Sequence, residues 1–204
     1  MPIHAVPKTI HSPDLRLVTN HSAGTYSLNS MIKREDICGY PLDNMTHLGE
    51  MLLRNKEMFP DEELIKSDIS DAYRNLPMHP LWQIKQINTI QGQRHVDCHN
   101  CFSGKGSGSL FIAFNSLVSW IGKNKYKIRN LGTYSDDSFG VELARNVTFY
   151  EPYNRLMLAN QVTLLSLWDR LGIPHKEKKQ VFGSKLTIIG INVDANNLTL
   201  TLPH

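Results

Sequence analysis

Short runs of apolar residues, separated by polar turns, divide this chain into elements that can be predicted one at a time. The beginning of the chain contains extended segments at residues 3–6 and 16–18, with a polar turn at residues 9–14 between them. Residues 44–56 carry methionines and leucines at helical spacing, and Pro60 follows as a stop. This region is therefore predicted to hold two strands and one helix.

The middle of the chain is predicted to combine strands with one long helix. A strand at residues 64–69 is followed by a hairpin, in which residues 84–90 and 94–98 flank a Gln-Gly-Gln turn. The apolar run at residues 110–121 is long enough for a buried helix. Residues 131–143 then predict a strand, an acidic turn and a second strand.

The last part of the chain contains the clearest helical pattern. Residues 157–171 form a broad apolar face at 3.6-residue spacing. Gly172 suits the left-handed position after a helix, and Pro174 prevents continuation. Residues 186–193 and 198–202 predict a final hairpin. The order of elements predicts an α+β fold, in which an antiparallel sheet is backed by helices.

Composition adds few constraints. The chain has 204 residues, of which 41% are hydrophobic and 20% are charged, as in an ordinary single globular domain. We expect an intracellular protein without membrane association, because neither a signal core nor a long apolar run is present. The formal net charge of +3 neither demands nor forbids nucleic acid. The basic run at residues 123–129 fits a solvated loop or a phosphate-binding patch.

The cysteines offer one competing interpretation. Residues 95–101 read HVDCHNC, which places a C-x-x-C spacing beside two histidines. A structural zinc site usually needs a second, distant pair of ligands, and only an isolated Cys38 and scattered histidines remain. We therefore favour an ordinary strand or loop here, and three cysteines fit a reducing compartment.

Two acidic landmarks carry the strongest chemical signal. One is Asp68 in the sequence KSDISDAY, and the other is the pair Asp136 and Asp137 in the sequence GTYSDDSFG. Adjacent carboxylates repel, so a fold that brings Asp68 beside them needs a compensating cation, and Mg²⁺ is the natural candidate. Two such ions, about 3.5–4 Å apart, can activate a hydroxyl and stabilise a leaving phosphate oxygen. The landmarks therefore predict phosphoryl transfer.

Taken in order, these motifs resemble the fingers–palm part of a reverse transcriptase of the retrotransposon type, over nearly all of the chain. The resemblance implies one reverse-transcriptase domain, residues 1–204, with a polymerase palm, partial fingers and an absent thumb. It places the fingers at about residues 1–43 and 76–106, and the palm at about residues 44–75 and 107–204.

The first motif, DISDAY, is similar to the family's D-x-x-x-A-[YF]. By this resemblance, Asp68 ligates both metal ions and the carbonyl of Ile69 ligates one. Ala72 and Tyr73 form the floor beneath the sugar of the incoming nucleotide. The ring of Tyr73 then excludes a ribose 2′-hydroxyl and selects deoxynucleotides; the competing reading is an ordinary core aromatic.

The second motif, YSDD, is similar to the family's Y-x-D-D turn. Asp136 is expected to be the second shared metal ligand, and Asp137 a supporting charge. In the later segment HKEKK, Lys178 is our choice of general acid for the leaving pyrophosphate, with Lys179 as the neighbouring alternative. A positioned acid contributes about 10²–10⁴-fold. A solvated basic turn is the competing interpretation.

A glycine-rich segment and a terminal hairpin complete the resemblance. Gly104 and Ser107 are expected to approach the template and the nascent base pair, because glycine permits close backbone contact. Gly108 departs from the family, where a proline commonly follows the serine. Gly190 is expected to hold the primer end.

Two basic residues near the amino terminus resemble the family's triphosphate contacts. Arg16 offers a planar fork to phosphate oxygens, whereas Lys8 acts as a point charge.

The function implied is that of an RNA-directed DNA polymerase core with two Mg²⁺ ions, or Mn²⁺ in their place. Its expected partners are an RNA or DNA template with primer, and deoxynucleoside triphosphates. A longer polyprotein is expected to supply the thumb and ribonuclease H parts. One alternative is an inactive or domesticated palm-fold remnant that acts as a nucleic-acid-binding or interaction module. A weaker alternative is an RNA-templated RNA polymerase, against which Tyr73 argues.

Overall fold

Strands in the described part of the chain pair antiparallel throughout, and helices accompany them, so the α+β prediction is confirmed. The computed structural model describes residues 1–7, 12–57 and 61–203. The chain divides into two units. The first unit comprises Met1–Tyr40 and Asp71–Ala113, and the second comprises Pro41–Ser70 and Phe114–His204.

The first unit is built from two hairpins and short helical turns. Strand β1 (Ile3–Pro7) pairs with β2 (Leu15–Thr19), and β4 (Ile87–Ile90) pairs with β5 (Gln93–Val96). Its other elements are η1 (Asn29–Met31), η2 (Glu35–Ile37), η3 (Ala72–Asn75), α2 (Pro80–Gln83) and the start of α3 (Ser107–Asn124).

The expected strand at residues 84–90 begins three residues late. Pro80 occupies the first turn of α2, and the side chain of His79 accepts a hydrogen bond from the backbone N–H of Leu81 at 3.3 Å. A capped turn with proline near its start favours helix, and Ile84 ends this turn in a helical conformation. The pairing therefore starts only at Ile87.

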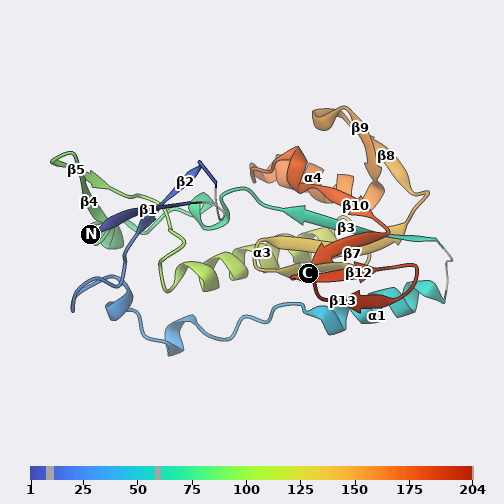
Figure 1. Cartoon of the computed structure of the whole chain (residues 1–204), viewed down its shortest axis with the longest axis horizontal. Helices are drawn as coiled ribbons and strands as arrows, with labels where there is room; N and C mark the ends of the chain where they lie inside the picture. The colour runs from blue at the N-terminus through green and yellow to red at the C-terminus, as the bar shows by residue number, and fades with distance from the viewer. Residues whose placement is uncertain (8–11, 58–60, 204) are drawn as a thin grey trace. The chain divides into compact units, whose positions relative to one another are not determined.

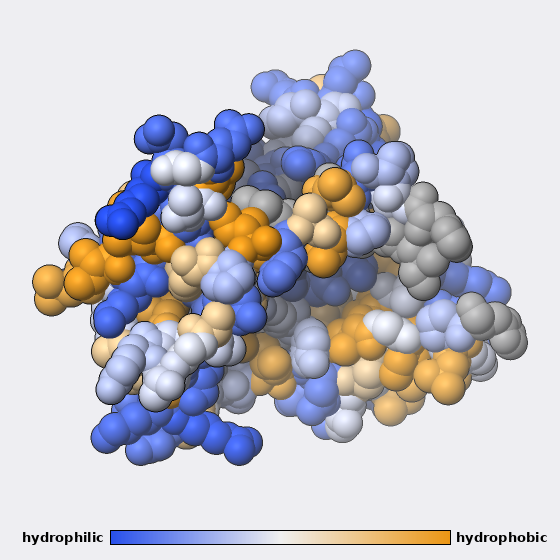
Figure 2. All heavy atoms as spheres, turned by 60° about the vertical axis from the view of Figure 1, so that its left-hand side comes forward, coloured by the Kyte–Doolittle hydropathy of each residue, from blue (hydrophilic) through white to orange (hydrophobic). Residues whose placement is uncertain are grey.

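Several large apolar side chains of the first unit are exposed. Leu81 is 75% exposed and Ile84 is 65% exposed. Figure 2 brings the left-hand side of Figure 1 forward and shows hydrophobic surface there, interrupted by hydrophilic residues. Within the described residues, no helix combines the length and the apolar character needed to cross a membrane.

The second unit centres on a four-stranded sheet with the strand order β10-β3-β7-β6. The strands are β3 (Glu62–Asp68), β6 (Leu131–Tyr134), β7 (Asp137–Leu143) and β10 (Val181–Gly183). The register sets Asp68 opposite Asp137 at one end of the β3–β7 ladder and Glu62 opposite Leu143 at the other. Strand β10 was not predicted from the sequence, because it is short.

Helix α1 (Met45–Lys56) begins with a capping box. The side chain of Asn44 accepts hydrogen bonds from the N–H groups of Thr46 at 2.9 Å and His47 at 3.3 Å. The ring of His47 in turn accepts from the N–H of Asn44 at 3.1 Å. These bonds satisfy backbone donors that a helix start leaves unpaired. Pro60, the expected stop, lies outside the described residues.

The core of the second unit joins α1, the sheet and the last strands. Its buried members are Leu48, Leu52, Leu64, Phe139, Val141, Ile188, Val193 and Ala195. Figure 1 shows α1 with β12 (Ile191–Asp194) and β13 (Thr199–Thr201) on one side of β3 and β7, and α4 (Ala159–Leu171) on the other. Truncating one such leucine to alanine costs about 2–5 kcal/mol, so this packing fixes the central strands.

The helix predicted from residue 157 starts later than expected. Met157 and Leu158 lie on β9 (Arg155–Leu158), which pairs with β8 (Val147–Tyr150), and α4 is Ala159–Leu171. Both residues are fully buried on the strand. Apolar residues that are buried in this way fit the periodicity of a helix as well as that of a strand. The expected left-handed Gly172 is confirmed, with φ +68°.

The last strands form a meander. Strands β11 (Lys185–Ile188), β12 (Ile191–Asp194) and β13 (Thr199–Thr201) pair in that order. The single strand expected at residues 186–193 was wrong, because Ile189 and Gly190 adopt positive φ values of 49° and 75° and turn the chain. The final hairpin is confirmed as β12–β13.

Candidate functional site

The predicted carboxylates of the second unit meet at one end of the four-stranded sheet. Asp68 ends β3 and Asp137 begins β7, and the two residues are directly opposite each other in the ladder. Asp136 occupies the two-residue turn between β6 and β7. Adjacent strands therefore supply two of the carboxylates, and the hairpin turn supplies the third.

The acidic turn is held from several directions. Ser135 adopts a positive φ of 56°, which closes the hairpin, and its carbonyl accepts a hydrogen bond from the Asn115 amide at 2.7 Å. Asn115 is buried on α3. The carbonyl of Asp136 accepts from the N–H of Ile69 at 3.4 Å. A strained turn that is hydrogen-bonded in this way keeps its carboxylates in place.

Two lysines supply positive charge at this end of the sheet. Lys179 Nζ lies 2.6 Å from Asp68 Oδ1, and Lys66 Nζ lies 3.3 Å from Asp137 Oδ2. Lys66 is two residues before Asp68 on β3, so both side chains are on one face of the strand. The balancing charge that adjacent carboxylates require is thus provided by ammonium groups.

The structure distinguishes the two lysines proposed for the leaving group. Lys179 contacts Asp68, whereas Lys178 is exposed and forms no ion pair with any described residue. Both lie in the 3₁₀ turn η5 (Glu177–Lys179), where a third of a turn separates neighbours. Only one of the two can point at β3. The resemblance favoured Lys178, and the structure shows that Lys179 is the one of the two whose side chain reaches a carboxylate of the site.

Burial and neighbouring charges act together on Asp137. Burial is the main cause that raises the pKa of this carboxyl, and the charges of Asp136 and Asp68 raise it further. Lys66 opposes both effects. The three carboxylates therefore interact electrostatically, and added positive charge at this point is favourable.

The residues fit a hard divalent cation in their chemistry. Carboxylate oxygens of Asp68, Asp136 and Asp137, with the carbonyl of Ile69, are the donors that Mg²⁺ prefers. The side chains are not gathered around a common point, however. Among residues 1–7, 12–57 and 61–203, no group of three or more His, Cys, Asp or Glu side chains is placed to hold a metal ion.

Two glutamines that the sequence analysis overlooked support the site. Gln161 is fully buried on α4 and donates to the carbonyls of Lys66 at 3.1 Å and Val181 at 3.2 Å. Gln180 is also buried and donates to the carbonyl of Asp68 at 3.1 Å. The only signal for Gln161 was a polar residue on the apolar face of a predicted helix.

The first unit holds the residues predicted to contact the nucleotide sugar. Ala72 is buried in η3, beside Tyr73. The ring of Tyr73 packs against Phe102 with a centroid distance of 4.9 Å and against Phe111 at 5.4 Å. Two aromatic neighbours fix the plane of this ring.

The remaining predicted residues are placed as follows. Ser107 begins α3, and its N–H donates to the carbonyl of Gly104 at 3.0 Å. Gly190 forms the turn between β11 and β12 in the second unit. Arg16 lies on β2, where its backbone pairs with Val6, and its side chain is outside the described part. Lys8 lies outside the described residues.

The C-x-x-C segment has no metal-like arrangement among its described neighbours. Cys98 is exposed, whereas Cys101 is buried. Cys101 Sγ lies 2.9 Å from Nε2 of the buried His21. Burial raises the pKa of this thiol and lowers that of the imidazole, so both groups stay neutral and serve the packing of the first unit.

Comparison with solved structures shows that the chain has a reverse-transcriptase-like fold. The chain is similar to the foamy viral protease-reverse transcriptase in complex with an RNA/DNA hybrid, with a TM-score of 0.64, 18% identity and coverage of 99% of this chain and 23% of that one. A second structure, in complex with double-stranded DNA, gives a TM-score of 0.67, 18% identity and coverage of 99% and 36%.

These comparisons show the fold alone. Sequence identity of 18% is too low to transfer an activity, and the chain spans only 23% and 36% of the length of the two solved chains. No family model matches the sequence, and no curated protein matches it.

Proposed function

We propose that the chain is the core of an RNA-directed DNA polymerase, which adds deoxynucleotides to a primer 3′-hydroxyl. The observation that carries this proposal is the in-register pair of Asp68 and Asp137 beside the Asp136 turn, with Lys179 at Asp68, in a reverse-transcriptase-like fold. We also propose that it is part of a retroelement polyprotein of the retrotransposon type. That polyprotein would supply the thumb and ribonuclease H parts.

Three residues would hold the metal ions in this mechanism. Asp68 and Asp136 would ligate two Mg²⁺ ions, or Mn²⁺ in their place, and the carbonyl of Ile69 would contribute to one. When bound, such ions activate the attacking hydroxyl and offset charge on the leaving oxygen. Asp137 would act as a supporting charge, and Lys66, paired with it, lowers its pKa against the larger, raising effect of burial.

Lys179 is the residue that we propose as the pyrophosphate contact. Its ammonium reaches Asp68, and its stem is flexible enough to move a few ångströms toward a phosphate oxygen. A proton donated there would assist departure of pyrophosphate. Lys178 is the alternative donor, and its exposed side chain would have to turn toward the site.

The first unit would bind the nucleotide and part of the nucleic acid. Tyr73, held by Phe102 and Phe111, would exclude a 2′-hydroxyl above Ala72. Lys8 and Arg16 would contact the triphosphate. Gly104 and Ser107 would approach the template, and Gly190 of the second unit would approach the primer end.

A nucleic-acid partner is supported by the solved relatives. One foamy viral structure holds an RNA/DNA hybrid and another holds double-stranded DNA. We propose that this chain takes a primed RNA or DNA template in the same way. Because base pairing would select the nucleotide, the protein would contact duplex shape and backbone.

One observation favours a second candidate, a palm-fold module that binds nucleic acid without catalysis. Asp68 and Asp137 are paired with lysines, and the described residues assemble no metal-binding group. Under this alternative the lysine pairs are permanent. Under the polymerase proposal they yield to metal ions and substrate.

A primer-extension assay separates the two candidates. The wild-type chain and Asp136→Asn would each receive a primed RNA template, Mg²⁺ and either deoxynucleotides or ribonucleotides. We expect extension by the wild type with deoxynucleotides only, and no extension by the variant. Binding of the template by both proteins without extension by either would establish the second candidate. Equal use of both nucleotide types would exclude the proposed role of Tyr73.

A further inference from the structure

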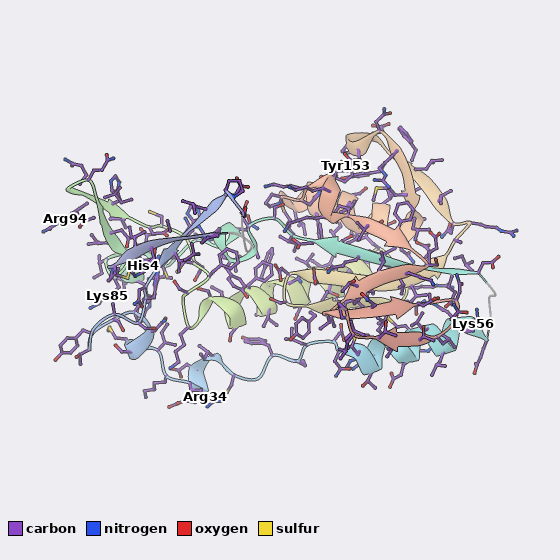
Figure 3. The ribbon with its side chains drawn as sticks, viewed as in Figure 1. His4, Arg34, Lys56, Lys85, Arg94 and Tyr153 are labelled. Atoms are coloured by element: carbon purple, nitrogen blue, oxygen red, sulfur yellow. The ribbon has the colours of Figure 1, made fainter. Side chains whose placement is uncertain are left out.

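Four polar side chains of the second unit form a continuous hydrogen-bonded network near the carboxylate end of the sheet. His175 Nε2 lies 3.0 Å from Asp169 Oδ1, and Tyr150 donates to Asp169 Oδ2 at 2.6 Å. The hydroxyl of Tyr153 contacts His175 Nδ1. Figure 3 labels Tyr153 near the tip of the β8–β9 hairpin. The network therefore joins that hairpin, the end of α4 and the segment that follows α4.

The direction of each hydrogen bond follows from the donors available. The Asp169 carboxylate only accepts, so Nε2 of His175 carries its hydrogen toward Asp169. We therefore assign Nδ1 as the acceptor of the Tyr153 hydroxyl. Burial, with the charge of Asp169, raises the pKa of Tyr153 to about 12 and that of Tyr150 beyond its ordinary value, so both phenols remain donors.

Burial fixes the imidazole within this network. The side chain of His175 is 6% exposed, and Tyr150 is 3% exposed. The fully buried Trp168 lies against the imidazole, with ring centroids 5.9 Å apart. A rotated His175 would lose its hydrogen bonds to Asp169 and Tyr153 and leave the nitrogens of its own buried ring without partners, which is costly. The side chain therefore has a single favoured position.

The backbone of this segment is joined directly to the end of β3. His175 pairs with Ile69 in an isolated β-bridge. The N–H of Ser70 donates to the carbonyl of Pro174 at 2.8 Å. The position of the imidazole thus determines which backbone groups meet at the residue that follows Asp68.

The same segment, residues 174–180, places Lys179 beside Asp68. Gln180 donates both to the carbonyl of Asp68 and to that of Lys176, each at 3.1 Å. Lys179 reaches the carboxylate of Asp68 at 2.6 Å. A shift of the segment by one residue would exchange Lys179 for Lys178 or Gln180 at this point. The register of the segment consequently decides which side chain faces the carboxylate.

We infer that His175 is a positioning residue, which Tyr153 and Asp169 hold so that residues 174–180 lie against Ile69 in the register that brings Lys179 to Asp68. The catalytic meaning of this inference rests on the proposed function. The positioning itself does not, and it can be measured without nucleotide addition.

The test removes one hydroxyl from the network in the full chain. Tyr153→Phe deletes the donor to His175 and keeps the ring, and Tyr126→Phe is the matched control on another half-buried tyrosine of the second unit. In Tyr153→Phe we expect amide exchange at Ser70 to accelerate about tenfold while the β3–β7 ladder is unchanged. We expect kcat for nucleotide addition to fall about tenfold, with KM unchanged within about twofold.

A second pair of variants tests the donor on His175 itself. His175→Gln keeps an N–H that can reach Asp169, and His175→Leu does not. We expect His175→Gln to recover most of the Ser70 protection and most of kcat that His175→Leu loses. Equal losses in both variants would overturn the inference. Should His175→Leu fail to fold, Tyr153→Phe still decides the question.

The remaining outcomes also separate the inference from the proposed function. Unchanged Ser70 exchange in Tyr153→Phe, or equal effects of Tyr153→Phe and Tyr126→Phe, would overturn the inference. Uniformly faster exchange across the β3–β7 ladder would show a structural role only and would also overturn it. If the wild type adds no nucleotide, the proposed function fails, and selective acceleration at Ser70 then supports positioning by itself.

Discussion

The two ends of the β3–β7 ladder carry acidic residues under opposite conditions. At one end Asp68 and Asp137 are directly opposite each other, and their side chains are 21% and 23% exposed. At the other end Glu62 and Glu142 are 2% and 7% exposed. One strand pair thus holds an open acidic end and a buried acidic end.

The partners of the carboxylates differ as well. Asp68 and Asp137 pair with lysines, whereas Glu142 accepts from the Asn146 amide and from the N–H of Asn160. Glu62 is buried and has no hydrogen-bond partner among the described residues. Burial raises the pKa of Glu62 to about 7, and Lys56 only partly opposes this.

The contrast shows which end can change partners. A partly exposed lysine pair contributes about 0–1 kcal/mol, so the ammonium group leaves a carboxylate at little cost. A buried carboxylate held by an amide and a backbone N–H has no such freedom. The open end therefore retains charged groups that can interact with a cation or a phosphate, and the buried end serves packing.

The largest expected effect follows removal of a carboxylate from the open end. Asp68→Asn is expected to lower single-nucleotide addition by about 10⁴-fold, because a shared ligand is lost. Its unfolding free energy is expected to change by less than about 1 kcal/mol, since the pair it breaks is partly exposed. Rapid-quench incorporation and urea unfolding measure the two quantities. Activity within tenfold of the wild type would remove Asp68 from the mechanism.

A smaller effect distinguishes the adjacent lysines. Lys179→Met is expected to lower the rate of nucleotide addition by about 10²-fold, whereas Lys178→Met leaves it within about twofold. The physical reason is that only Lys179 reaches Asp68. The same incorporation assay compares the two variants. A larger loss in Lys178→Met would restore the choice made from the sequence.

The buried end is expected to affect stability and its pH dependence. The pKa of Glu62 in the folded chain is about 7, above its ordinary value of 4.5. Below pH 4.5 the group is protonated in both states; as pH rises toward 7 only the unfolded state ionises, so folding stability falls. Glu62→Gln is expected to remove this decline and to gain at least about 1 kcal/mol at pH 8.

Urea unfolding of the wild type and Glu62→Gln at pH 5 and pH 8 measures that difference, with Glu63→Gln on the same strand as the control. A wild-type stability that rises from pH 5 to pH 8, with Glu62→Gln unchanged, would show that Glu62 has a partner in solution. The comparison between the two ends would then lose its physical basis.

The smallest expected effect concerns Asp137. Lys66 is the group that lowers the pKa of Asp137 against burial, so Lys66→Met is expected to raise that pKa. Carboxyl chemical shifts followed against pH by NMR measure the change. An unchanged titration of Asp137 would mean that Lys66 does not contact it in solution.

The sequence indicated where the carboxylates of the open end lie on the sheet, because short-range patterns define the strands and the turn that carry them. A strand pattern at residues 64–69 and an acidic turn between two apolar strands are local signals. Their meeting in register follows once β3 and β7 are neighbours. The choice between Lys178 and Lys179 was not local, because it depends on how η5 lies against β3.

Other features needed contacts between distant segments. Met157 and Leu158 fit a helical face as well as they fit β9, and only pairing with β8 decides between them. The polar network of Tyr150, Tyr153 and His175 comes from segments whose sequences give no sign of their partners. The burial of Glu62 was not predicted from the sequence, because an acidic residue at the start of a strand usually remains in solvent.

The most direct test applies the same chemical change to both ends. Asp136→Asn and Glu142→Gln each replace a carboxylate by an amide in the second unit. In primer extension with Mg²⁺ and deoxynucleotides, we expect Glu142→Gln to extend like the wild type and Asp136→Asn to show no extension. Equal extension by all three proteins would contradict the assignment of the open end as the polymerase centre.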